Sequence, residues 1–298
     1  MQFERLALIG CGLMGGSFAL AARKASLVGS VCGYSRSEKS AWRARELGIV
    51  DAVASTPADC VQGADLVLVA VPVASTQSVL QDLLPQLAET ALVMDVGSTK
   101  QDVVHAAETA LGERMGQFMP AHPICGKEVA GIEHADSQLY RDQQVILTPL
   151  PCHTEADVQR ATALWQALDC RVRHMPPALH DQALAAVSHF PHMLAFAVMH
   201  SLMAQPEGKA FLAVGGPGFR DSTRIAAGDP DLWTDVLLAN ATEVIAQSQR
   251  LHSALLDIET LLTNGDREGL RAFISRASQR RAAWRMSGGP EDASKPSD

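Results

Sequence analysis

Short apolar runs alternate with amphipathic stretches from the start of the chain to about residue 175. Runs rich in β-branched and other apolar residues, bounded by turn residues, predict strands over residues 6–10, 31–35, 66–71, 91–96 and 145–148. Helical periodicity follows the first of these and also covers residues 75–87 and 155–168. Several of the strands are apolar at consecutive positions, as strands covered on both faces require. This pattern predicts an α/β domain over residues 1–175 with a doubly wound, largely parallel sheet.

The pattern changes near Met175, because no further convincing strand appears and the remaining residues favour helices. A helix is predicted over residues 178–203, with a kink at Pro191, since proline lacks the amide donor and clashes with the preceding turn. A short helix and a glycine-rich loop at residues 215–218 follow. We therefore expect a second, all-α domain over residues 176–286.

One very long helix is predicted from Asp229-Pro230, which supplies a cap and a first-turn proline, to Asn264-Gly265. Positions three or four apart form a largely apolar stripe along it: Ala241, Val244, Ser248, Leu251, Leu255, Ile258 and Leu262. A helix of about 50 Å outreaches a small domain, which favours a dimer-forming element over an internal core helix. Residues 287–298 are polar and are predicted to be a disordered tail.

A glycine-rich segment directly follows the first predicted strand and leads into the first helix: Gly10-Cys11-Gly12-Leu13-Met14-Gly15-Gly16. In such a loop the first glycine permits a tight turn, the second lets backbone approach a pyrophosphate, and the third lets helix and strand pack closely. The helix N-terminus then faces the phosphates. Because strand, loop, helix and second strand all occur at the expected spacing, we predict that Gly10, Gly12, Leu13, Met14 and Gly15 bind a nicotinamide dinucleotide.

The residues after the second predicted strand bear on which dinucleotide is bound. An NAD-preferring site normally places an acidic side chain there, against the ribose 2′-hydroxyl, but this chain has Tyr34-Ser35-Arg36-Ser37. Ser35, Arg36 and Ser37 could hold a 2′-phosphate through charge-assisted hydrogen bonds. NADP is therefore favoured. NAD stays possible because Glu38 lies close by, and Arg36 could also be an ordinary solvated side chain.

Two candidate catalytic residues follow predicted strands. Ser98 lies just beyond the strand at residues 91–96, at the edge where such sheets gather ligands, although it could instead cap the next helix. His122 ends the next strand region. An imidazole near a nicotinamide is suited to accept the proton of a hydroxyl group as hydride leaves, because its ordinary pKa of about 6.5 lies near working pH.

The helical half holds further candidates around the expected kink and the glycine-rich loop. Ser188, His189 and His192 flank Pro191, but no carboxylate completes a metal-ligand set, so no metal is expected. Arg224 or Arg220 could form a bidentate fork to a substrate carboxylate; either could instead pair with Asp221 or Asp229.

Composition excludes several classes of function. The 298 residues are 47% hydrophobic, which can fill two cores, and the formal net charge is −8 with no long basic block. Neither nucleic acid nor a membrane surface is expected as a partner. The six scattered cysteines favour free thiols, and the first residues lack a secretory signal pattern, so we expect a cytoplasmic protein. No run of about 20 uninterrupted apolar residues predicts a spanning helix.

Five motifs, in order, resemble those of prephenate and arogenate dehydrogenases. They are Gly10-Cys11-Gly12-Leu13-Met14-Gly15-Gly16-Ser17, Asp95-Val96-Gly97-Ser98-Thr99-Lys100, His122-Pro123-Ile124-Cys125-Gly126-Lys127-Glu128, Ser188-His189-Phe190-Pro191-His192 and Phe219-Arg220-Asp221-Ser222-Thr223-Arg224-Ile225-Ala226. The resemblance implies an N-terminal Rossmann domain, a helical C-terminal dimerisation domain that forms a homodimer, and a site in the cleft between the two domains. It implies oxidative decarboxylation of prephenate to 4-hydroxyphenylpyruvate, or of arogenate to tyrosine, with reduction of NAD(P).

The same resemblance implies a role for each site residue. His122 would accept the proton of the substrate C4 hydroxyl, with Ser98 orienting that pair. Arg224 would bind a substrate carboxylate, His192 would contact the other end of the substrate, and Trp233 would help to wall the site. Ser188 and Lys127 are also expected to contact substrate. Lys127 departs from the small polar residue of many relatives and leaves the choice between prephenate and arogenate open.

Two other interpretations compete with this one. A 3-hydroxyacid dehydrogenase of the 6-phosphogluconate dehydrogenase type would also have a Rossmann domain and a helical tail. Enzymes of that type resemble one another in carrying a catalytic lysine in the first long helix of the tail, and residues 178–203 contain no lysine. A non-catalytic NAD(P)-binding redox sensor would need a partner surface, and none is recognisable in the sequence.

Overall fold

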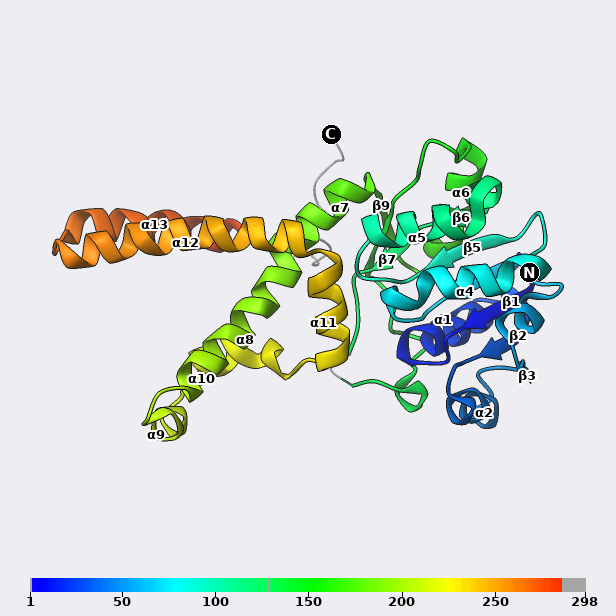
Figure 1. Cartoon of the computed structure of the whole chain (residues 1–298), viewed down its shortest axis with the longest axis horizontal. Helices are drawn as coiled ribbons and strands as arrows, with labels where there is room; N and C mark the ends of the chain where they lie inside the picture. The colour runs from blue at the N-terminus through cyan, green and yellow to red at the C-terminus, as the bar shows by residue number, and fades with distance from the viewer. Residues whose placement is uncertain (1, 128, 286–298) are drawn as a thin grey trace. The chain divides into compact units, whose positions relative to one another are not determined.

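A computed structural model describes residues 2–127 and 129–285 of the chain (Figure 1). The predicted tail at 287–298 lies outside the described residues. The chain divides into two compact units, Met1–Ala241 and Thr242–Asp298. The functional domain boundary expected at residue 175 falls within the first unit, between its last strand and its first tail helix.

The first unit is built on a wholly parallel six-stranded sheet with the order β3-β2-β1-β4-β5-β6. This is the strand order of a dinucleotide-binding fold, so the doubly wound sheet predicted from the sequence is confirmed. The strands are β1 (Phe3–Ile9), β2 (Val28–Tyr34), β3 (Ala52–Val53), β4 (Leu66–Val69), β5 (Leu92–Asp95) and β6 (Phe118–Met119).

Alternate side chains of the sheet separate two hydrophobic cores. Leu6 and Leu8 of β1 face one core, whereas Ala7 and Ile9 face the other. Helices α1 (Leu13–Lys24), α2 (Glu38–Glu46) and α6 (Glu155–Gln166) contribute to the first core. Helices α3 (Pro57–Val61), α4 (Thr76–Leu83) and α5 (Gln101–Leu111) contribute to the second. The consecutive apolar positions of the strands therefore reflect burial on both faces.

A second, three-stranded sheet has the order β7-β8-β9. Its strands are β7 (Ala121–Pro123), β8 (Gln144–Leu147) and β9 (Arg171–His174). Strands β7 and β8 pair antiparallel, so the strand predicted at 145–148 exists but does not extend the parallel sheet. Strand β9 escaped prediction because three of its four residues are exposed and polar. Short 3-10 segments complete this half: η1 (Val73–Ser75), η2 (Leu84–Gln86), η3 (Gly112–Gln117) and η4 (Ile132–His134).

The helix predicted over residues 178–203 is present but irregular in its middle. Helix α7 (Pro177–Leu184) passes through a π-helical turn, η5 (Ala185–His189), into α8 (Phe190–Met203). The distortion precedes Pro191, because proline cannot donate to the carbonyl four residues back and the wider turn absorbs that lost bond. Helices α9 (Gly208–Ala213) and α10 (Pro217–Thr223) and the 3-10 turn η6 (Arg224–Ala227) follow.

By length and composition alone, the helical segment Pro177–Met203 could cross a membrane, since its mean hydropathy reaches 1.2 over 18 residues. The sequence pattern had not indicated this. One such segment is weak evidence, and this one carries the fully buried polar side chains of His180 and Asp181.

The prediction of a single long helix over residues 229–264 is wrong, because two helices occupy this range. Helix α11 (Pro230–Ala239) ends at Asn240, where φ is −111° and ψ is 29°, and α12 (Ala241–Thr263) begins after it. The Asn240 side chain is buried and bonds elsewhere in the first unit, which accounts for the break. The predicted ends are confirmed: Asp229 accepts from the Leu232 amide at 2.9 Å, and Gly265 turns the chain at φ +61° before α13 (Arg267–Ala283). A dimer can therefore no longer be inferred from the length of this helix.

Candidate active site

The glycine loop has the geometry that a dinucleotide requires. Gly10 has φ +109°, and a Cβ there would lie 2.2 Å from the Ala70 carbonyl oxygen. A Cβ on Gly15 would lie 2.3 Å from the Gly10 carbonyl oxygen, so this glycine lets α1 pack closely on the loop. Gly12, the N-cap of α1, has open space at its Cβ position and no side-chain cap. The first turn of α1, with Leu13 and Met14, therefore leaves amide donors for a pyrophosphate.

The residues predicted to face the ribose lie just beyond β2. Ser35 is half-buried, and Arg36 is exposed. Ser37 caps α2, because its hydroxyl oxygen accepts from the Ser40 amide at 3.3 Å. Arg36 is thus the one cation of the expected trio, and Ser37 has a structural task beside any contact with a nucleotide.

His122 is a buried residue of β7 whose ring is held by a second histidine. Its Nδ1 atom lies 2.8 Å from Nε2 of His180 on α7. Burial, followed by the charges of His180, Lys100 and His189, holds the pKa of His122 well below its usual value. The imidazole is therefore neutral near pH 7, as a proton acceptor must be.

Asp181 anchors the other side of His180. Its Oδ1 atom lies 2.7 Å from His180 Nδ1, and its two carboxylate oxygens accept the backbone amides of Lys100 and Gln101, each at 2.8 Å. Burial alone would raise the pKa of Asp181, but the bonds from His180 and the two amides outweigh it and lower that pKa. A carboxylate from α7 therefore binds the N-terminus of α5 and joins the helical part of the first unit to its sheet.

A buried ion pair lies between these elements. The Lys100 ammonium group contacts Asp95 Oδ2 at the end of β5, and both side chains are almost entirely buried. Asp95 also accepts the Ala121 amide at 2.9 Å and the Gly97 amide at 2.8 Å. The pair thus ties the segment that carries Ser98 to the strand that carries His122.

His189 and Asn240 extend the buried polar network. Asn240 Nδ2 donates to the Asp181 carbonyl oxygen at 2.8 Å and lies 3.0 Å from His189 Nδ1. Burial lowers the pKa of His189 to about 4, opposed by the Asp181 charge and by the backbone of Ser98. The structure therefore brings Ser98 next to His189, whereas His122 Nδ1 shares its hydrogen bond with His180.

Three of the residues expected to bind substrate lie together. The His192 ring stacks on Trp233 with ring centres 3.5 Å apart, and its Nδ1 donates to the Ser188 carbonyl oxygen at 2.9 Å. The pKa of His192 is lowered, mainly by burial. The hydrogen bond to the Ser188 carbonyl opposes this shift, and the positive charge of Arg224 adds to it. Arg224, in η6, is thus close enough to His192 for its charge to lower the pKa of that imidazole.

Lys127 lies in the loop after β7. Its ammonium group is 3.1 Å from Asp136 Oδ2 and 3.2 Å from the His134 carbonyl oxygen. Lys127 therefore has an ion-pair partner, Asp136, at the protein surface. A contact between Lys127 and the substrate stays a prediction.

Several members of this network were not predicted from the sequence: Asp95, Lys100, His180, Asp181 and Asn240. Asp95 and Lys100 are the first and last residues of the motif at 95–100. For His180 and Asp181, the available signal was a pair of polar residues within a largely apolar helix. His122 and His180 are 58 residues apart in sequence, so no local sequence pattern could reveal their contact.

The comparisons with known proteins agree with this geometry. Residues 18–174 match the family model for the prephenate dehydrogenase nucleotide-binding domain, and residues 176–276 match the model for its dimerization domain. The chain belongs to the prephenate dehydrogenase family. It is 32% identical to the cyclohexadienyl dehydrogenase of Zymomonas mobilis, over 94% of this chain and 96% of that protein.

Solved structures of family members have the same fold. Prephenate dehydrogenase from Aquifex aeolicus, in complex with hydroxyphenyl propionate and NAD+, matches with a TM-score of 0.88 and 32% identity, covering 95% of this chain and 98% of that one. Synechocystis arogenate dehydrogenase matches with a TM-score of 0.81 and 26% identity, covering 93% and 99%.

Membership of the prephenate dehydrogenase family decides between the interpretations left open by the sequence. The chain is an NAD(P)-dependent dehydrogenase, which replaces the redox-sensor alternative. Both of its parts match this family, which replaces the 3-hydroxyacid dehydrogenase alternative. The Rossmann domain and the helical C-terminal domain expected from the motifs are confirmed.

Proposed function

We propose that this chain oxidises and decarboxylates prephenate, arogenate or both, with NADP favoured over NAD, in tyrosine biosynthesis in the cytoplasm. The observation that carries the proposal is the neutral, buried imidazole of His122, held in one orientation beside the carboxyl ends of a dinucleotide-binding sheet. The free state of all six cysteines agrees with a reducing compartment.

The glycine loop and the first turn of α1 would hold the dinucleotide, which supplies a hydride acceptor when bound. Here His122 accepts the proton of the C4 hydroxyl, while the hydrogen on C4 leaves with its electron pair and the O–H pair forms the carbonyl bond. Loss of the ring carboxylate as CO2 then returns an electron pair to the ring, and the proton held by His122 completes the phenol. Atoms and charge balance without any further reactant.

The remaining residues orient this reaction. Ser98 hydrogen-bonds the reacting hydroxyl and directs it toward His122. Arg224 binds a carboxylate of the dianionic substrate, and His192, stacked on Trp233, contacts its other end with Ser188 alongside. Lys127 contacts the substrate and distinguishes the amino acid side chain of arogenate from the keto acid of prephenate.

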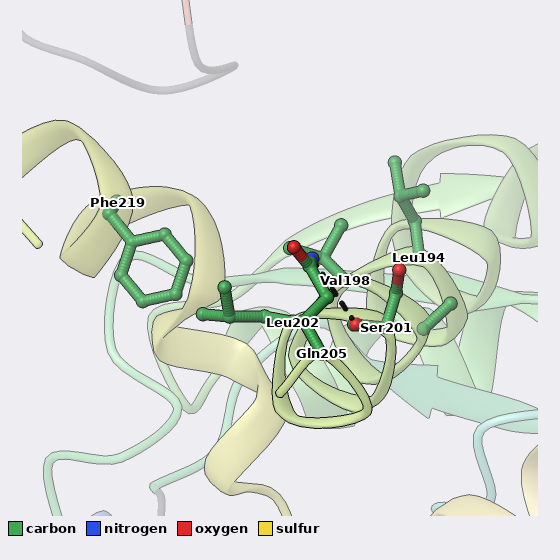
Figure 2. A pocket seen from close by; sticks show the side chains of 7 residues that line it. Leu194, Val198, Ser201, Leu202, Gln205 and Phe219 are labelled. Atoms are coloured by element: carbon green, nitrogen blue, oxygen red, sulfur yellow. Dashed lines mark hydrogen bonds between the residues drawn. The ribbon is translucent and has the colours of Figure 1, made fainter. Parts of the chain in front are cut away.

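We further propose that the enzyme is a homodimer through its helical C-terminal domain. An apolar groove between α8 and α10 is lined by Leu194, Ala197, Val198, Ser201, Leu202, Gln205 and Phe219. Figure 2 shows the Leu202 side chain pointing toward the Phe219 ring. Leu194 and Val198 are both exposed, and a groove of this kind within a dimerization domain is suited to a second copy of the chain.

The proposed function is tested by measuring reduced nucleotide in four reactions, each of prephenate and arogenate with each of NAD and NADP. We expect turnover in at least one reaction, and the fastest of the four to contain NADP. Absence of turnover in all four, with a folded protein that binds nucleotide, would overturn the proposal.

The preference for NADP is tested at Arg36. Arg36→Gln removes the cation proposed to face the 2′-phosphate, and a charge-assisted bond is typically worth about 1.5–3 kcal/mol. The expected result is a fall of about 10- to 100-fold in kcat/KM for NADP, with kcat/KM for NAD changed by less than about twofold. Lys24→Gln is the control: it makes the same change of charge at the last residue of α1, at the end of that helix away from the glycine loop. Equal effects on both nucleotides would show that Arg36 does not read the phosphate.

A further inference from the structure

Three side chains form a continuous hydrogen-bonded chain that ends at the proposed base. Asp181 Oδ1 lies 2.7 Å from His180 Nδ1, and His180 Nε2 lies 2.8 Å from His122 Nδ1. His180 and Asp181 are fully buried, whereas His122 keeps a little exposure. The side chains of His180 and Asp181 are therefore shielded from bulk solvent.

The hydrogen bonds made by Asp181 determine where each proton lies between Asp181, His180 and His122. The backbone amides of Lys100 and Gln101 can only donate, and both point at the Asp181 carboxylate, which must therefore be an acceptor. His180 Nδ1 must then carry a proton and donate it to Asp181. In neutral His180, this leaves a lone pair on Nε2.

The same logic passes to the next ring. Because His180 Nε2 is an acceptor, His122 Nδ1 must carry a proton and donate it. The remaining nitrogen of neutral His122, Nε2, then holds the lone pair. This is the tautomer in which the ring nitrogen away from His180 is free to accept a proton.

We propose that His180 and Asp181 are positioning residues that hold His122 in the tautomer protonated on Nδ1, so that Nε2 accepts the proton of the substrate hydroxyl. The inference rests on the proposed function for the role of His122. The pair makes and breaks no covalent bond: the substrate O–H bond breaks, the Nε2–H bond forms, and the protons between Asp181, His180 and His122 stay in place. The buried carboxylate also stabilises the imidazolium that this step creates.

A purely structural role would also explain a buried pair that joins α7 to the start of α5. The two roles differ in one observable, the tautomer of His122. If the pair is purely structural, replacing His180 should not change the tautomer of His122. If the pair positions His122, replacing His180 should change that tautomer.

The deciding experiment measures ring ¹⁵N chemical shifts in long-range ¹H–¹⁵N spectra of the histidine-labelled full chain, with the His122 signals assigned from His122→Asn. In the wild type we expect His122 Nδ1 protonated and Nε2 unprotonated near pH 7. In His180→Leu we expect the protonated nitrogen to shift toward Nε2 and kcat to fall about 10- to 100-fold, with nucleotide affinity unchanged. His180→Gln is the matched variant, because its amide can both donate to Asp181 and accept from His122, and it should recover most of the tautomer and the rate.

A wild-type His122 protonated on Nε2, or a His180→Leu variant with unaltered tautomer and kcat, would overturn the inference. The wild-type spectrum gives this answer even if His180→Leu fails to fold. It also requires no turnover, so a chain that oxidises neither substrate but shows the expected tautomer would contradict the proposed function and leave the positioning role standing.

Discussion

His122→Asn is expected to lower kcat by about two to four orders of magnitude while nucleotide affinity stays within about twofold. Asparagine keeps a polar side chain that can bond to His180 but cannot take up a proton. His122 lies on β7, away from the glycine loop in sequence, so the dinucleotide should bind as before. Steady-state rates with saturating substrate, together with nucleotide titration by fluorescence, measure both quantities.

His174→Asn is the matched control for this variant. His174 ends β9 and bonds to Thr162 at the surface, so the same substitution there should leave kcat unchanged. If His122→Asn turned over at a near-normal rate, His122 would not be the base. If it lost nucleotide binding as well, the fall in rate would have a structural origin.

Lys100→Met is expected to lower the free energy of unfolding by about 3–5 kcal/mol, the largest effect on stability that the described contacts predict. Methionine fills much of the space of the buried lysine but leaves the Asp95 carboxylate in the protein interior without its cation. Two backbone amides still bond to Asp95, which offsets only part of this cost. Urea unfolding at pH 7, followed by circular dichroism and tryptophan fluorescence, gives the difference.

Lys24→Met provides the surface comparison, because Lys24 is exposed on α1 and its loss should change stability by less than about 0.5 kcal/mol. The double variant Asp95→Asn with Lys100→Met should be more stable than Lys100→Met, since no uncompensated charge remains. A Lys100→Met protein as stable as Lys24→Met would contradict the buried ion pair.

The fold was predictable wherever one local pattern dominates. The apolar runs located β1, β2, β4 and β5 to within a few residues, and the glycine spacing predicted the tight contacts of Gly10 and Gly15. Strand β9 and the break at Asn240 were not predictable in this way. The polar side chains of β9 lie at an exposed edge, and Asn240 leaves the helix because its amide bonds to Asp181, a partner 59 residues away.

The candidate site divides along the same line. Motifs pointed to His122, Ser98, His192 and Arg224 one by one, because their residue types carry recognisable chemistry. The partners that orient them were hidden. His180 and Asp181 stand in an ordinary helical pattern, and only the packing of α7 against α5 brings them to His122.

The most direct test of this account follows the carboxylate that the proposed reaction releases. Prephenate labelled with ¹³C in the ring carboxylate is incubated with the purified protein and NADP. The account predicts labelled CO2, 4-hydroxyphenylpyruvate and reduced nucleotide in equal amounts, with arogenate giving tyrosine if it is the preferred substrate. Reduction of the nucleotide with the label retained in the organic product, or no reduction with either substrate and either nucleotide, would contradict it.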